Sequence, residues 1–232
     1  MPLVTTLIPI WNVQSDWLQT CLQSVNAQNF SDHECLIVSD GCPDQKILDD
    51  IEHYCHLNSK FRLFHRPHRG IAHALNFGLS MTESKYVARL DCDDFNVGER
   101  IQKQFQFMED NPQITLSGGS MCDTDGKMKY IPHCPKRITL KGFREAVSRN
   151  STYIFHPTYF FRRAEVEEYP TDYEHSEDTA FICKLVLKHR KIDNLPDILV
   201  AHRLHPNRMS AINRDAQVRN TIRAIEEILG GI

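Results

Sequence analysis

Short apolar runs alternate with amphipathic stretches through the first 112 residues, and this alternation constrains the fold more than any other feature of the chain. Apolar runs beside turn signals predict strands over Leu3–Ile10, Glu34–Ser39, Phe61–His65 and Tyr86–Leu90. A helical apolar period predicts four helices. The first starts at Ser15 or Asp16, the second ends at about Leu57, and the other two span Gly70–Met81 and Gly98–Asp110. Repeated β-α-β units of this kind imply an α/β domain with parallel strands and right-handed crossovers.

The second half of the chain is less regular. Strands are predicted over Ile114–Ser120, Lys129–Pro132 and Thr158–Arg162, and helices over Leu140–Ser148, Thr179–His189 and Asn213–Leu229. The last helix is amphipathic, with one face of Ala216, Ile222, Ile225 and Leu229 opposite Arg214, Arg219 and Arg223. Such a helix packs on its own domain or on a second subunit, or lies on a membrane surface, and we expect packing.

Composition narrows the class of protein. With 232 residues, 41% of them hydrophobic and 25% charged, the chain suits one soluble globular domain. A formal net charge of −3 gives no global basic field, so we expect no nucleic-acid partner. No run approaches the roughly 18 apolar residues of a transmembrane helix, and no basic region precedes a signal-like segment. The eight cysteines are scattered without a C-x-x-C pair, which predicts reduced thiols in a cytoplasmic protein.

Three of the predicted strands end in unusual polar loops, at Pro9–Asn12, Ser39–Gly41 and Asp91–Asp94. In an open parallel sheet, ligands bind beyond the carboxyl ends of the strands. If the three strands are neighbours, their loops therefore meet in one crevice. The alternative is that each loop is only a turn, because Asp and Gly are common turn residues.

The last of these loops carries an acidic cluster. Asp91 and Asp93 follow a strand, whose two-residue period points them to the same side while Asp94 turns away. Two like charges this close repel each other unless a cation lies between them. Hard divalent cations prefer carboxylate oxygens, and Mg²⁺ is often shared with substrate phosphates. The pair indicates a divalent metal site, with a solvated turn as the alternative.

Seven segments, in this order, resemble successive motifs of family 2 glycosyltransferases. They are Pro9–Asn12, Val38–Asp44, Arg69–Asn76, Arg89–Asp94, His156–Thr158, Ser176–Asp178 and His202–Asn207. The resemblance covers nearly the whole chain and implies the GT-A fold, a central, mostly parallel twisted sheet flanked by helices. It also implies an inverting, metal-assisted hexosyl or N-acetylhexosaminyl transfer. The donor would be a nucleotide-diphosphate sugar, expected to be a UDP-sugar, and the acceptor a hydroxyl of a glycan or lipid-linked glycan.

The resemblance implies roles for the donor-binding residues. Asp40 would hydrogen-bond the base of the nucleotide, on a bed formed by Pro9 and Trp11. Asp91 would lie near the ribose and the metal. Asp93 would bind the Mn²⁺ or Mg²⁺ ion that bridges the diphosphate.

Other implied roles compete with ordinary structural ones. Asp178, with Glu177 as second choice, matches the catalytic base of the family, although acids at the start of a helix also serve as caps. His205 matches a histidine that adds a metal contact in some members and would favour Mn²⁺; a turn histidine, or His202 in its place, is the alternative. Arg69 would face the phosphates or the base, unless it is a solvated loop arginine.

The chain departs from the family pattern at three places. Ser39 stands where the family has an Asp, Trp11 stands where it usually has Tyr, and Gly98–Arg100 lacks the usual Pro. None of these changes touches the metal assignment. They leave the identity of the nucleotide open.

We therefore expect a single domain over residues 1–232, with a nucleotide-binding half over 1–112, an acceptor and catalytic half over 113–212, and a C-terminal helix over 213–232. The expected partners are a nucleotide sugar and a glycan or glycolipid acceptor of polysaccharide biosynthesis. A homodimer and a peripheral contact with the inner face of the membrane stay open.

Two other functions compete with this one. A sugar-nucleotide pyrophosphorylase would need a glycine-rich, basic loop after the first strand, and Pro9–Asn12 has neither glycine nor positive charge. A non-catalytic nucleotide-sugar or glycan-binding module would be expected to have lost catalytic positions, yet Asp93, Asp178 and His205 are all present.

Overall fold

The computed structural model describes residues 1–124, 128–131, 154–206 and 208–230. The elements of the first half are β1 (Val4–Ile10), α1 (Ser15–Asn26), β2 (His33–Asp40), α2 (Gln45–Leu57), β3 (Phe61–Arg66), α3 (Ile71–Ser80), β4 (Tyr86–Arg89), β5 (Phe95–Asn96) and α4 (Arg100–Asp110). Those of the second half are β6 (Ile114–Thr124), β7 (Met128–Ile131), η1 (His156–Thr158), β8 (Phe160–Arg162), η2 (Arg163–Glu165), α6 (Glu177–Leu187), β9 (Lys191–Arg203), α7 (Met209–Ile212) and α8 (Arg214–Leu229). The helix predicted over Leu140–Ser148 lies outside the described residues.

Four parallel strands, in the order β3-β2-β1-β4, form the first part of the sheet. Their bounds, and those of the helices between them, agree with the sequence prediction within two residues. All seven residues of β1 are buried, as expected for a central parallel strand covered on both faces. Its two threonines bury their hydroxyls in hydrogen bonds, Thr5 to Ser84 at 2.7 Å and Thr6 to the ring of His33 at 2.7 Å.

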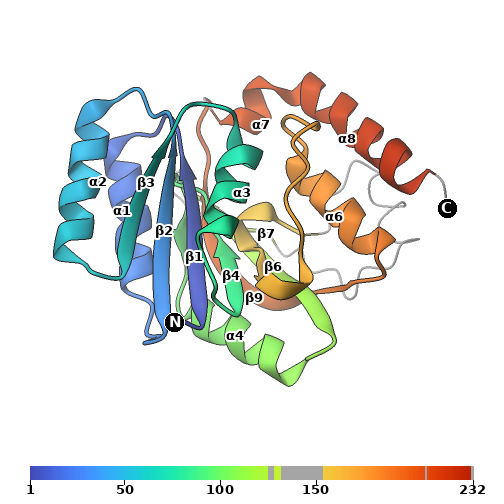
Figure 1. Cartoon of the computed structure of the whole chain (residues 1–232), viewed down its shortest axis with the longest axis horizontal. Coiled ribbons are helices and arrows are strands. Elements are labelled where there is room, and N and C mark those ends of the chain that lie inside the picture. The colour runs from blue at the N-terminus through green and yellow to red at the C-terminus, as the bar shows by residue number, and fades with distance from the viewer. Residues whose placement is uncertain (125–127, 132–153, 207, 231–232) are drawn as a thin grey trace.

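Helices cover both faces of the sheet, which makes a three-layer α/β/α domain (Figure 1). On one face α1 and α2 pack against alternate residues of β1 and β2, and α4 packs beside them on β4 and β8. On the other face α3, α6 and α8 share a second apolar core with the opposite side of β1, β2 and β4. The expected α/β architecture with a mostly parallel sheet flanked by helices is confirmed.

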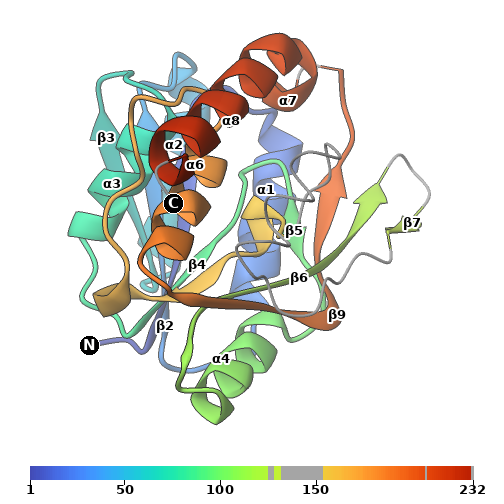
Figure 2. The same cartoon turned by 90° about the vertical axis from the view of Figure 1, so that its right-hand side faces the viewer.

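The second half extends the same sheet with strands of mixed direction. β8 runs antiparallel beside β4, and β6, β9 and β5 follow in that order. Figure 2 shows β7 and the far end of β6 projecting away from the helices. β9, thirteen residues long, was not predicted. A bulge interrupts it where Leu195 and Ile198 pair with successive residues of β6, which leaves Pro196 and Asp197 outside the register.

A fully buried arginine joins α4 to the C-terminal end of β4. The guanidinium of Arg100 donates to the side chains of Asn96 and Gln104, both at 2.9 Å, and to the carbonyls of Arg89 and Tyr159 at 2.8 and 3.3 Å. All four acceptors are neutral. Burial and the nearby charge of Arg89 lower the pKa of Arg100 to about 9.

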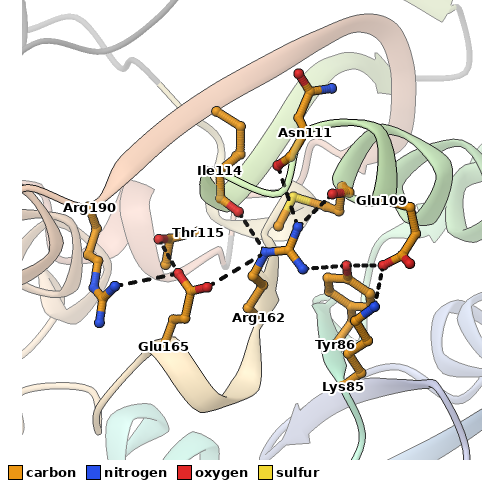
Figure 3. A network of polar contacts seen from close by, with 10 residues as sticks. Lys85, Tyr86, Glu109, Asn111, Ile114, Thr115, Arg162, Glu165 and Arg190 are labelled. Atoms are coloured by element: carbon orange, nitrogen blue, oxygen red, sulfur yellow. Dashed lines mark hydrogen bonds and ion pairs between the residues drawn. The ribbon is translucent and has the colours of Figure 1, made fainter.

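A second arginine joins the strands at the opposite end of β4 (Figure 3). Arg162, on β8, donates to the carbonyls of Ile114 at 3.0 Å and Met108 at 2.6 Å, and to the hydroxyl of Tyr86 at 2.7 Å. Tyr86 in turn donates to Glu109. Because this network links β4, β6, β8 and α4, it fixes the junction between the parallel and mixed parts of the sheet.

The C-terminal helix α8 packs on the domain, as expected, but not with the whole predicted face. Ala224 and Leu229 are buried, and Ile225 and Ile228 pack against the core that contains α6. Ile222 is 49% exposed, so its assignment to the packed face was wrong. The packed face is turned because polar contacts, such as Ser176 Oγ to the carbonyl of Gln217 at 2.8 Å, also join α8 to the start of α6.

Two expectations from composition have a structural counterpart. Six cysteines of the described ranges, Cys21, Cys35, Cys42, Cys55, Cys92 and Cys183, are free thiols. In the same part of the chain, no helix has the length and apolar character needed to cross a bilayer.

Candidate active site

The loops after β1, β2 and β4 lie at one edge of the sheet, because these strands are parallel neighbours. Trp11 follows β1, Asp40 ends β2, and Asp91 lies just beyond β4. The prediction that these loops share one edge is confirmed. Two later segments are also candidates for the site: the loop after β9, which contains His205, and the start of α6.

Asp40 holds the loop between β3 and α3 against β2. Its carboxylate is 4% exposed and accepts the backbone N–H groups of Arg69 at 2.9 Å and Gly70 at 2.8 Å. The ring nitrogen Nδ1 of His68 lies 2.8 Å from the same carboxylate. The His68 ring also stacks on Trp11, with 4.7 Å between ring centroids and 18° between ring planes.

The structure changes the expected bed for a nucleotide base. Trp11 is 42% exposed and offers a ring surface, whereas Pro9 is buried inside β1, and its contact with a base stays a prediction. Arg69 is exposed, and its backbone rather than its side chain contacts Asp40. His68 was not predicted to be part of the site, because nothing in the sequence distinguishes it from the other eleven histidines.

The acidic loop is a turn rather than a continuation of the strand. β4 ends at Arg89, and the chain bends at Cys92 and Asp93. Asp91, Asp93 and Asp94 therefore each bring one carboxylate oxygen within 4.8 Å of the others. The prediction that Asp94 turns away, which assumed a two-residue strand period, was wrong for this reason.

Arg89 balances part of this negative charge. Its guanidinium makes a two-pronged ion pair with the carboxylate of Asp91, and the arginine side chain is only 3% exposed. Burial raises the pKa of Asp91, and the Arg89 charge opposes that rise. The sequence placed Arg89 in the apolar run before the acidic loop and in the Arg89–Asp94 motif, but gave its side chain no role.

His205 reaches back to the acidic loop from the end of β9. Its Nε2 lies 2.9 Å from the carboxylate of Asp93, and its ring packs on Trp17 of α1 with 4.6 Å between centroids. Arg203 fixes the same segment, because its backbone N–H donates to Asp94 at 2.9 Å and its guanidinium donates to the Asp93 carbonyl at 3.1 Å. The structure thus brings together two of the residues predicted to bind metal.

The chemistry of this cluster fits a hard divalent cation. Three carboxylates and a histidine nitrogen form the kind of donor set that suits Mn²⁺ or Mg²⁺. The buried Oδ2 of Asp94 has no hydrogen-bond partner among the described residues. Burial, followed by the charges of Asp91 and Asp93, raises the pKa of Asp94 well above its usual range. A cation would relieve this repulsion.

The two acids that open α6 differ in their surroundings. Glu177 is 7% exposed, and burial together with the charge of Asp178 raises its pKa to about 8. Asp178 is partly exposed and accepts the N–H of Thr179 at 2.6 Å. Burial raises the pKa of Asp178, but that N–H and the charge of Arg89 favour its ionised form. The charge of Arg89 also acts to lower the pKa of Glu177, and the charge of Asp91 acts to raise it.

Two other histidines considered from the sequence have separate partners. His202 Nδ1 lies 3.1 Å from Asp123, outside the acidic turn, so His205 rather than His202 contacts Asp93. His156, from the His156–Thr158 motif, is 9% exposed and lies 3.2 Å from the hydroxyl of Tyr169, so it packs inside the domain.

Comparisons with known proteins point to one family. The chain is 23% identical over 224 residues to EpsJ of Bacillus subtilis, which is named an uncharacterized glycosyltransferase. The aligned region covers 91% of this chain and 64% of EpsJ. It is 27% identical over 204 residues to the amylovoran biosynthesis glycosyltransferase AmsE of Erwinia amylovora. This aligned region covers 84% of the chain and 74% of AmsE. The chain thus spans less than two thirds of the length of EpsJ.

Solved structures share the fold. TarS of S. aureus, in complex with UDP, matches with a TM-score of 0.70 and 20% identity, over 99% of this chain and 71% of the other. The mannosyltransferase PcManGT of Pyrobaculum calidifontis, in complex with GDP-Man and Mn²⁺, matches with a TM-score of 0.74 and 16% identity, over 99% and 64%. The sequence model described as glycosyl transferase family 2 matches residues 5–169. The chain therefore belongs to glycosyl transferase family 2.

Proposed function

We propose that this protein is an inverting glycosyltransferase that moves a sugar from a nucleoside diphosphate donor to a hydroxyl of a glycan or lipid-linked acceptor. The observation that carries the proposal is the contact of 2.9 Å between Asp93 and His205, made beside a cluster of three carboxylates. A donor set of this kind suits the cation of a diphosphate leaving group. UDP is the expected nucleotide: TarS was solved with UDP and UDP-GlcNAc, although PcManGT was solved with GDP-Man.

In this proposal the metal-binding residues are Asp93 and His205, with Asp91 and Asp94 beside them. A bound Mn²⁺ or Mg²⁺ supplies a Lewis acid that neutralises charge on the departing diphosphate. The charge of Arg89 favours the ionised form of Asp91, and their ion pair holds that carboxylate in place. Arg203 holds the backbone of the turn from the opposite side, so the carboxylates are fixed before the donor arrives.

Asp178 is the proposed general base. It would take the proton of the acceptor hydroxyl as that oxygen attacks the anomeric carbon on the face opposite the diphosphate, and a single displacement of this kind inverts the carbon. A general base must be ionised before the reaction. The Thr179 N–H and the charge of Arg89 favour the ionised form of Asp178, whereas a pKa of about 8 keeps most Glu177 side chains protonated at pH 7. The N-terminus of α6 also favours a negative charge at this position.

The nucleotide base would lie beside Trp11 and Asp40. The half-exposed indole ring provides a stacking surface, and the carboxylate of Asp40 provides an acceptor for a base N–H. Arg69 lies on the loop between β3 and α3, next to Asp40, and its side chain would face the phosphates or the base. The relative AmsE is named for amylovoran biosynthesis, which supports a polysaccharide or its lipid-linked precursor as the acceptor.

The test is release of nucleoside diphosphate from a panel of UDP- and GDP-sugars with Mn²⁺, with and without glycan acceptors. We expect Asp93→Ala and Asp178→Asn to abolish most of the release. Asp110→Asn is a matched control, because Asp110 is an exposed acid at the far end of α4. Release that both site variants leave at the wild-type rate would refute the proposed site, and binding of donors without any turnover would favour a non-catalytic binding module.

A further inference from the structure

The imidazole ring of His68 makes two contacts that a nucleobase would otherwise make. It stacks on Trp11, with 4.7 Å between centroids and 18° between planes. Its Nδ1 lies 2.8 Å from the carboxylate of Asp40 and 3.0 Å from the carbonyl of the same residue. A flat ring that stacks on an aromatic side chain and directs a ring nitrogen at a carboxylate matches the binding mode of a pyrimidine or purine with an N–H group.

The backbone around His68 is fixed independently of its ring. Asp40 accepts the N–H groups of Arg69 and Gly70, which hold the loop by the main chain. Gly41 allows this close approach, because a Cβ at that position would lie 2.7 Å from the backbone nitrogen of His68. The His68 side chain is 51% exposed. Rotation about its Cα–Cβ bond would therefore move the ring into solvent without moving the loop.

We infer that His68 is an internal occupant of the base-binding site, and that a nucleotide binds only when its base replaces the His68 ring on Trp11 and Asp40. The inference rests on the proposed function, which puts the base at these two residues. His68 then acts as a positioning residue that sets the affinity for the donor. It also shields the Trp11 ring and the Asp40 carboxylate while no nucleotide is bound.

The size of the effect follows from the contacts that must be broken. A stacked aromatic pair and a polar contact made by a half-exposed ring are individually weak, so the ring is in place for most but not all of the time. The apparent dissociation constant rises in inverse proportion to the fraction of molecules with an open site. We therefore expect removal of the ring to tighten nucleotide binding by roughly three- to tenfold.

Calorimetric titration of UDP and GDP, each with Mn²⁺, would test this. His68→Ala removes the ring, and we expect the dissociation constant for the nucleotide to fall roughly three- to tenfold. His68→Phe keeps a ring that stacks but cannot donate to Asp40, so its affinity should lie between those of the wild type and His68→Ala. His65→Ala is the matched control, because His65 lies in β3, just before the loop that carries His68, is 49% exposed and pairs with Glu52 instead. It should bind as the wild type does.

Two results would overturn the inference. A dissociation constant that His68→Ala leaves unchanged means that the ring does not compete with the base, and a larger constant means that His68 is itself part of the binding surface. Trp11→Ala separates these outcomes from a failure of the proposed function. If Trp11→Ala binds both nucleotides as tightly as the wild type, or if no protein in the series binds either nucleotide, the proposed base site is wrong and the role of His68 falls with it.

Discussion

The two acids at the start of α6 should respond very differently to loss of their charge. Glu177→Gln replaces a carboxyl group by a neutral amide of the same shape, and Asp178→Asn does the same one residue later. With a pKa of about 8, only roughly one Glu177 in ten is ionised at pH 7. An uncharged glutamine at this buried position is therefore close to the state that the wild-type side chain already adopts.

We expect Glu177→Gln to keep the rate of donor turnover at pH 7 within about threefold of the wild type. Asp178→Asn should lose roughly 10²- to 10⁴-fold, which is the usual contribution of a general base. The assay is continuous detection of UDP or GDP released from the best donor with Mn²⁺, with Asp110→Asn as the control for loss of an acid elsewhere. A loss of 10²-fold or more in Glu177→Gln, with Asp178→Asn near the wild-type rate, would reverse the assignment of the base.

Stability gives an independent measure of the same protonation state. The pKa of Glu177 is higher in the folded protein than in the unfolded chain, so the folded state binds an extra proton between pH 4.5 and about 8. The wild type should lose stability as the pH rises through this window. Glu177→Gln cannot ionise and should lack that loss in urea denaturation. Equal pH profiles for the two proteins would mean that Glu177 is ionised in the folded state.

Three further outcomes follow from the structure. Burial and the charge of Lys60 lower the pKa of His33 from 6.5 to about 4. The contribution of neutral His33 to the unfolding free energy should therefore be fully present above pH 6.5 and fall by about 3 kcal/mol as the pH drops towards 4. His33→Gln should not show this loss in urea titrations. Arg100→Leu removes the donor of four buried acceptors, of which the Tyr159 carbonyl still accepts the N–H of Arg89, and should cost at least about 3 kcal/mol of unfolding free energy; a loss below 1 kcal/mol would contradict the role given to that side chain. Chelation by EDTA should stop donor turnover and Mn²⁺ should restore it, with roughly tenfold more Mn²⁺ needed by His205→Ala; turnover that persists in EDTA would rule out the metal site.

Local patterns were sufficient to predict the parallel half of the sheet. Each of its strands is a short apolar run closed by a turn signal, and periodicity detects such runs well. β9 was missed because its sequence mixes Asp193, Asn194 and Pro196 with apolar residues, which is unlike a regular strand. The pairing of β9 with β6, and the bulge that accommodates the proline, depend on tertiary contacts that no local pattern encodes.

The site was predicted in part for the same reason. The acidic loop and Asp40 stand at the ends of predicted strands, so their shared edge followed from topology. The contact between Asp93 and His205 was suggested only by the family resemblance, because 112 residues separate the two. Arg89 and His68 were missed because a buried ion pair and a ring stack depend on side-chain directions in space. The same limit explains why Ile222 was put on the wrong face of α8.

The span of 112 residues between Asp93 and His205 has a consequence for folding. An ion bound by both side chains would act as a reversible cross-link that closes most of the second half of the chain into a loop. The conformational entropy that such a cross-link removes from the chain grows with the length of the loop. Mn²⁺ should therefore raise the melting temperature of the whole domain. Because one ligand comes from each end of the loop, His205→Ala should lose much of that gain, even with all three aspartates intact.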